Sequence, residues 1–124
     1  MFEEIEVQKH EIQEKLSKLL NTNIKVKDLM VKDNYTLKVT QGSESGSLFF
    51  YSYEFEIVHG DAIVLRLAED YTQWGGYTTF LVVPLELGTV IKERYYSEQS
   101  GSETSEDVDY YIFTKNGWVK VEVE

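Results

Sequence analysis

Residues 108–123 read VDYYIFTKNGWVKVEV, and this stretch decides the fold class. Two runs with alternating apolar residues, 108–114 and 118–123, flank the turn sequence Lys115-Asn116-Gly117. An Asn-Gly pair favours a tight hairpin because both residues tolerate the positive φ that such a turn requires. The stretch is therefore predicted to form a β-hairpin.

Period-two patterns further upstream predict more strands. A long strand is expected over 48–58, where aromatic residues alternate with polar ones. The turn sequence His59-Gly60-Asp61 follows, and residues 62–67 are predicted to run back beside the long strand as a second hairpin. Two further strands are predicted over 35–40 and over 77–83, which ends at Pro84. Residues 24–31 fit a short strand or a strand pair, and residues 89–96 fit a strand better than the alternative of a short helix.

The first twenty residues have a different period. Their apolar side chains recur at helical spacing with charged residues between them, which predicts one amphipathic helix over 2–20. The sequence Asn21-Thr22-Asn23 ends it, because these short polar side chains compete for backbone hydrogen bonds. The apolar positions are Ile5, Ile12, Leu16, Leu19 and Leu20.

One helix followed by strands predicts an α+β fold, with the N-terminal helix packed on a mostly antiparallel meander sheet of about six strands. The 124 residues fit a single domain, 1–124, with the helix over 1–20 and the sheet over 24–124. Two segments rich in Ser, Gly and Glu, near 41–47 and 97–107, are predicted as mobile loops.

Composition excludes several classes of protein. The chain has no cysteine, so disulfides, thiolate zinc sites and cysteine nucleophiles are absent. Its longest apolar run, 79–85, is too short to span a membrane. The N-terminus is acidic where a secretory signal would be basic and then apolar, so a cytoplasmic location is expected.

The charge is unevenly distributed along the chain. Residues 1–40 hold seven acids and seven lysines, so the whole formal charge of −10 belongs to residues 41–124. A negative field of this kind attracts basic partners and repels nucleic acid. Direct nucleic-acid binding is therefore not expected, because phosphate contacts need clustered Lys and Arg.

Few residues offer catalytic chemistry. His59 and Asp61 share a turn with Glu56 upstream, and these three could form a base or a hard metal site if they converged. Glu6, His10 and Glu14 share one helix face, which equally describes a solvated face with a stabilising His–Glu pair. No nucleotide-binding, hydrolase or metal-binding motif is present, so the protein is predicted not to be an enzyme and to need no cofactor or metal.

Aromatic residues next to acids suggest a binding surface, since aromatic rings supply contact area and carboxylates steer cations. The competing interpretation is that the rings form half-buried cross-strand pairs. Trp118 is expected to face outward if Val119, Val121 and Val123 face the core. The candidate partner-binding residues are Glu69, Asp70, Tyr71, Trp74, Glu103, Glu106, Asp107, Asp109 and Trp118.

In size, acidity and lack of cysteine the chain resembles small bacterial or phage antagonist proteins, a likeness of profile that carries no site across. The leading hypothesis is a non-enzymatic acidic binding protein that inhibits a basic protein partner, such as an immunity protein against a nuclease toxin or a phage-encoded inhibitor of a defence enzyme. The alternative is a small-ligand or nucleotide-binding domain with an aromatic-lined pocket. Tyrosine-rich edge strands with few lysines also allow a homodimer.

Overall fold

The computed structural model describes residues 2–32, 36–45, 49–72, 75–99 and 103–124, with side chains described over 9–32, 36–42, 53–71, 76–96 and 105–124. One helix is followed by eight strands, which confirms the α+β class and exceeds the six strands expected. The elements are α1 (Phe2–Leu20), β1 (Val26–Lys32), β2 (Leu37–Ser45), β3 (Phe49–His59), β4 (Ala62–Thr72), β5 (Gly75–Pro84), β6 (Val90–Gln99), β7 (Glu103–Thr114) and β8 (Gly117–Val123).

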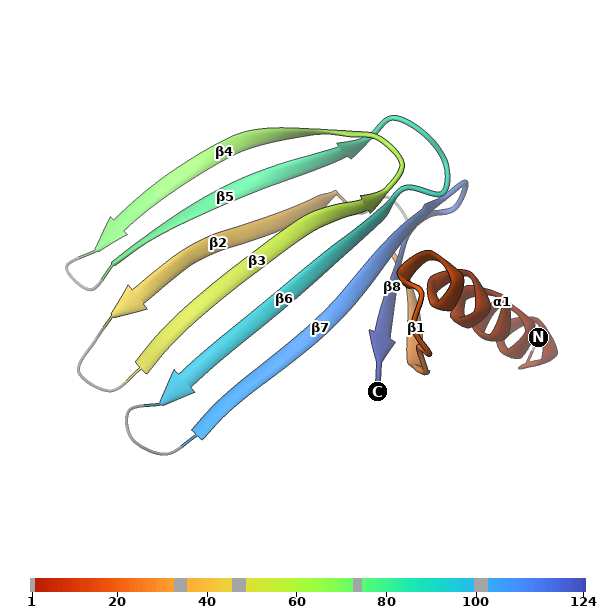
Figure 1. Ribbon diagram of the computed structural model, residues 1–124. Coiled ribbons are helices and arrows are strands. Elements are labelled where there is room, and N and C mark those ends of the chain that lie inside the picture. The colour runs from red at the N-terminus through yellow and green to blue at the C-terminus, as the bar shows by residue number, and fades with distance from the viewer. Residues whose placement is uncertain (1, 33–35, 46–48, 73–74, 100–102) are drawn as a thin grey trace.

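The strands form one curved antiparallel sheet in the order β1-β8-β7-β6-β3-β2-β5-β4. The hairpins β2–β3, β4–β5 and β6–β7 extend side by side, with their connecting ends at the left of Figure 1. The helix α1 lies at the opposite end with β1 and β8 (Figure 1). Among the described residues β2 and β3 pair only next to their connection, where residues 43–45 meet residues 50–52.

The predicted hairpin at the C-terminal end is confirmed. Thr114 pairs with Gly117, and the register continues to Asp109 opposite Glu122. Gly117 has φ 113°, a value that a residue with a side chain rarely adopts. The Asn-Gly signal therefore predicted the hairpin, although the turn residues between the last pair are Lys115 and Asn116, and of Asn116 and Gly117 only Gly117 has a positive φ.

The predicted hairpin between residues 48–58 and 62–67 is wrong. β3 pairs with β6 and β2, whereas β4 pairs with β5 at the edge of the sheet. The turn between them binds the β5–β6 connection instead, because the carbonyl of Asp61 accepts hydrogen bonds from Leu85 N (2.9 Å) and Thr89 Oγ1 (3.2 Å). A local turn signal cannot distinguish a hairpin from a crossing between two halves of a sheet.

Much of the two stretches predicted as loops is strand. β2 continues through Ser45, β6 through Gln99, and β7 begins at Glu103. Residues 46–48 and 100–102 lie outside the described part of the chain. Cross-strand pairing in long hairpins overrides the weak strand preference of Ser, Gly and Glu.

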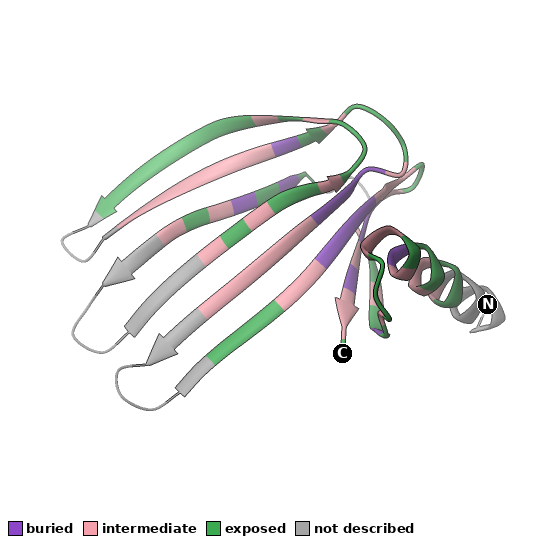
Figure 2. Cartoon of the chain, in the orientation of Figure 1, coloured by how far each residue is buried: buried purple, intermediate pink, exposed green. Residues whose placement is uncertain are grey.

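The hydrophobic core lies at the end of the sheet beside α1. Figure 2 shows buried residues gathered there, whereas β4 is exposed along most of its length. The core consists of two clusters, one on each face of the sheet. The helix-side cluster packs against α1, and the inner cluster lies on the face that points away from α1. The helix-side cluster is Leu16, Val26, Val90, Tyr110, Ile112, Val119 and Val121; the inner cluster is Leu37, Val39, Val82, Ile91, Tyr111 and Trp118.

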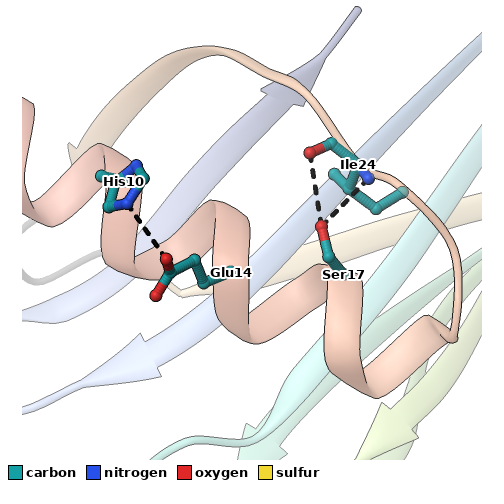
Figure 3. A network of polar contacts seen from close by, with 4 residues as sticks. All are labelled: His10, Glu14, Ser17 and Ile24. Atoms are coloured by element: carbon teal, nitrogen blue, oxygen red, sulfur yellow. Dashed lines mark hydrogen bonds and ion pairs between the residues drawn. The ribbon is translucent and has the colours of Figure 1, made fainter.

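Polar side chains anchor α1 to the segment that leads into β1. The hydroxyl of Ser17 accepts a hydrogen bond from Ile24 N at 3.0 Å and lies 3.4 Å from Ile24 O, to which it donates (Figure 3). Gln13 Oε1 accepts a bond from Val26 N at 2.9 Å. These contacts satisfy backbone groups before the first strand pair and fix the direction in which the chain enters the sheet.

Candidate functional site

Four carboxylates form a row across four adjacent strands. Asp28 on β1 is opposite Glu122 on β8, Glu122 is opposite Asp109 on β7, and Asp109 is opposite Glu93 on β6. Residues directly opposite each other in antiparallel strands point to the same face, so the row lies on one side of the sheet. Val121, which neighbours Glu122 in sequence, points to the other side and packs against α1 in the helix-side cluster.

The inner part of the row is electrostatically strained. Burial raises the pKa of Glu93 above its ordinary value, and the charge of Asp109 raises it further. Burial likewise raises the pKa of Asp109; Lys120 opposes this, and the charges of Glu122 and Asp107 add to it. Burial first, and repulsion between like charges second, make both carboxyl groups hold a proton more firmly than they would in water.

Lys120 compensates only part of this negative charge. Its Nζ lies 3.7 Å from Asp109 Oδ2, and both side chains are largely buried, at 25% and 22% exposure. The row has four carboxylates, so one nearby ammonium group leaves it negative. A cation that approached this face would therefore be attracted.

A surface hollow of about 540 Å³ opens beside the row. It lies where β8 ends at Val123 while β7 extends further, which leaves residues 103–108 of β7 without a strand on that side (Figure 1). We call this hollow the acidic notch. Its lining is Lys27, Glu106, Asp107, Val108, Asp109, Lys120, Glu122, Val123 and Glu124. Five of these side chains are acidic and two are basic, so the notch is negative.

Three of the predicted partner-binding residues, Glu106, Asp107 and Asp109, line the acidic notch. Glu103 begins the same strand, but its side chain is not described. Glu106 is partly neutralised, because its Oε1 lies 2.9 Å from Arg94 Nε, without the geometry of a hydrogen bond. Asp107 is exposed. The sequence analysis therefore predicted some of the residues that line the acidic notch.

The second predicted group lies elsewhere. Glu69, Asp70 and Tyr71 belong to β4 and are exposed, and β4 is five positions away from β7 in the strand order. At the usual strand spacing this is on the order of 20 Å, so one small ligand cannot contact both groups. Trp74 lies outside the described residues.

The prediction that Trp118 faces outward is wrong. Its side chain is 1% exposed and packs edge-on against Phe113 and Tyr111, with ring centroids 5.2 and 6.5 Å apart. On the other face of β8, Val119 and Val121 are buried as well and Val123 is half-buried, because the curved sheet has a core on both sides there. A buried indole cannot contact a partner, so Trp118 is removed from the candidate site.

The residues considered for catalysis do not converge. His59, Asp61 and Glu56 are all exposed, and no ion pair or hydrogen bond joins their side chains. Within the described part of the chain, no group of three or more His, Asp or Glu side chains could hold a metal ion. His10 Nε2 lies 3.0 Å from Glu14 Oε1 on the solvent side of α1, as the solvated-face interpretation expects (Figure 3).

Comparison with known proteins gives no relative. No family model matches the chain, and neither a curated protein nor a solved structure is similar to it. No helix in the described residues is long and apolar enough to cross a membrane. The function must therefore be argued from the site alone.

Sequence reasoning missed Asp28, Glu93 and Glu122 as members of the site. The Asn-Gly signal predicted that β7 and β8 pair, but a two-residue Asn-Gly turn would place Lys115 opposite Trp118, whereas Thr114 lies opposite Gly117. The register that places Asp109 opposite Glu122 therefore does not follow from the turn signal alone, and neither do the registers of β1–β8 and β6–β7, which bring in Asp28 and Glu93. Only the assembled sheet brings the four carboxylates together.

Proposed function

We propose that this protein is a non-enzymatic acidic binding protein that neutralises a basic protein partner, whose lysine and arginine side chains enter the acidic notch. The single observation that carries the proposal is the carboxylate row, in which the pKa values of Glu93 and Asp109 are raised. Burial is the main cause of both shifts, repulsion from neighbouring carboxylates adds to it, and Lys120 offsets only part of it. A cation from a partner would relieve this repulsion, and the relief adds to the affinity.

The partner best matched to such a surface is a protein with a cationic groove that normally holds phosphate, such as a nuclease toxin or another nucleic-acid enzyme. Carboxylates on a rigid sheet can occupy that groove in place of phosphates. The proposed role is then that of an immunity protein or a phage-encoded inhibitor acting in the cytoplasm. The net charge of −10 supports fast, electrostatically steered association with such a target.

The test is affinity capture from a lysate of the source organism, followed by association kinetics with the captured protein. The wild type is compared with the double variant Asp107→Lys/Glu122→Lys, which reverses two charges in the notch. Glu86→Lys is the matched control, because Glu86 is exposed in the β5–β6 connection at the other end of the sheet. Circular dichroism checks that every variant is folded.

The proposal expects one basic protein to be retained at low salt and weakened at high salt. The notch variant should lose this protein and slow its association by about tenfold or more, whereas Glu86→Lys should change it little. An association rate that does not depend on ionic strength would contradict the electrostatic argument. Equal binding by the notch variant and the control would place the contact elsewhere.

The alternative, a small-ligand domain with an aromatic-lined pocket, has no specific observation in its favour. The three described hollows contain at most one aromatic side chain each. The described rings pack against one another instead, as in the pair Phe55–Phe80, whose centroids are 5.4 Å apart. Among the described residues, the aromatic side chains in these pairs and in the inner cluster pack within the sheet and do not line a ligand cavity.

A further inference from the structure

The strand β4 is an unprotected edge of the sheet. It is the last strand in the order and pairs only with β5. Residues 65–71 are all exposed, and the apolar side chains Ile63, Leu65 and Leu67 remain 46%, 49% and 47% exposed. Its backbone groups on the free side have no strand partner, so this edge is a template for pairing with another strand.

The opposite edge of the sheet is protected in the usual ways. β1 has only 7 residues, carries Lys27 and Lys32, and contacts α1. By contrast, β4 has 11 residues with neither lysine nor proline. Natural proteins use short strands, lysine and proline to prevent edge pairing, so their absence at β4 indicates that pairing is tolerated there.

We propose that β4 pairs antiparallel with β4 of a second copy of this chain, about a two-fold axis beside Ala68. The β-bulge in β4 sets this register. Arg66 is opposite Phe80 and Ala68 is opposite Thr79, so Leu67 is the extra residue of the bulge. Counted in β5 positions, Arg66 and Glu69 lie equally far on either side of Ala68, and so do Val64 and Tyr71.

This register makes the edge complementary to itself. Arg66 lies opposite Glu69 of the second copy, and by symmetry the same ion pair forms twice. Val64 lies opposite Tyr71 of the second copy, a pairing of β-branched and aromatic residues that stabilises antiparallel sheets. The residues in each pair share a face, because their β5 partners are an even number of residues apart. The pairing also uses the strand from residue 63 to residue 72, nearly its full length.

Charge favours a second copy at this edge although the whole chain is acidic. From Ala62 to Ala68 the only charged residue is Arg66, so the negative field is weakest along this half of β4. The acids Glu69 and Asp70 follow directly, and the antiparallel register places this acidic half against the basic half of the other copy. A strand of unrelated sequence would have neither a bulge at the corresponding position nor the same order of basic and acidic residues. The acidic notch lies on β7 and β8 and stays open in the dimer.

The test is a charge-complementation experiment with the full chain, read by sedimentation velocity over a range of concentrations. Arg66→Glu and Glu69→Lys each replace both intermolecular ion pairs by two like-charge pairs. Each variant alone should raise the dimer dissociation constant by about tenfold or more. Glu86→Lys, with the same charge change as Glu69→Lys, should leave it nearly unchanged.

The decisive sample is the equimolar mixture of Arg66→Glu and Glu69→Lys. A mixed dimer restores both ion pairs, one in its original form and one with reversed polarity, and has the same total charge as the wild-type dimer, so dimerisation should return to near the wild-type level. Within one chain, Arg66 Nη1 and Glu69 Oε1 already lie 2.8 Å apart, and mixing does not rebuild that contact in either variant. Recovery therefore reports contact between copies.

Three results would overturn the proposal: a monomeric wild type at every concentration, single variants that dimerise as well as the wild type, or a mixture that does not recover. Thermal unfolding of each variant confirms that it is folded. If the wild type is monomeric but still captures a basic protein through the notch, the dimer fails while the proposed function stands.

Discussion

Glu93 and Asp109 lie directly opposite each other on β6 and β7, and burial raises the pKa of both carboxyl groups. The charge of Asp109 raises the pKa of Glu93 further, the charges of Glu122 and Asp107 raise that of Asp109, and Lys120 lowers both. An apolar pair or a pair of opposite charges at these two positions would stabilise the sheet more than two carboxylates do. The retained repulsion is what the proposed cationic partner would use.

We predict that Glu93→Gln stabilises the protein at pH 7. The pKa of Glu93 is raised above its ordinary value of 4.5, so the folded state binds this proton more tightly than the unfolded state. The stability that it contributes is present below the unfolded pKa and is lost as the pH rises through the folded pKa. Glutamine does not ionise and so avoids this loss. The free energy of unfolding of the variant should therefore exceed that of the wild type by an amount that grows from pH 4 to pH 7.

The measurement is urea unfolding of both proteins at several pH values. Glu54→Gln is the control, because Glu54 is a 62% exposed carboxylate on the neighbouring strand β3. Its removal should change the free energy of unfolding by less than about 1 kcal/mol at any pH. A Glu93→Gln variant that is less stable than the wild type at pH 7 would contradict the assigned repulsion.

Trp118 is predicted to be a major contributor to stability. Its side chain is 1% exposed and contacts Phe113 and Tyr111 within the inner cluster. Trp118→Ala should lower the free energy of unfolding by about 3–5 kcal/mol, because a large cavity forms in a packed core. Leu87→Ala, at a position 64% exposed, should cost less than about 1 kcal/mol. Equal effects in denaturant unfolding would show that the indole is not buried.

Two glycines with the same backbone conformation provide a matched comparison. Gly60 and Gly88 have φ of 83° and 89°, so alanine is strained at both. A Cβ at Gly60 would lie 2.6 Å from Thr89 Oγ1 and 2.8 Å from Thr89 Cα, whereas one at Gly88 meets nothing within 4 Å. Gly88→Ala should cost about 1 kcal/mol, and Gly60→Ala clearly more.

The readout for the glycine pair is the melting temperature, with Gly60→Ala melting several degrees lower than Gly88→Ala. The difference reports how tightly the β3–β4 turn packs on the β5–β6 connection. If both variants melt together, that contact does not contribute to stability.

The hydroxyl of Ser17 should stabilise the junction between α1 and β1. Ser17→Ala loses the bonds to Ile24, worth about 1 kcal/mol each, and regains roughly 0.5 kcal/mol of helix propensity. A net loss of about 1.5 kcal/mol is expected, together with faster hydrogen exchange of the Ile24 amide. Lys18→Ala, at an exposed helix position, should alter neither quantity. Unchanged exchange at Ile24 in Ser17→Ala would mean that the anchor is not needed.

The sequence by itself determined the local elements of this protein. The helix over 2–20 follows from the spacing of its apolar residues, and the pairing of β7 with β8 follows from the Asn-Gly turn signal. Both signals act between residues close in sequence, where backbone geometry and side-chain periodicity leave few alternatives. The α+β class followed from their combination.

Only the tertiary structure decided which strands became neighbours. Sequence adjacency predicted a β3–β4 hairpin, yet β3 pairs with β6, because strand choice depends on burying faces that are distant in sequence. The register of the β6–β7 pair placed Glu93 opposite Asp109. Curvature of the sheet then buried both faces of β8, so alternation alone could not tell that Trp118 is core. Periodicity tells which residues share a face; long-range packing determines what covers that face.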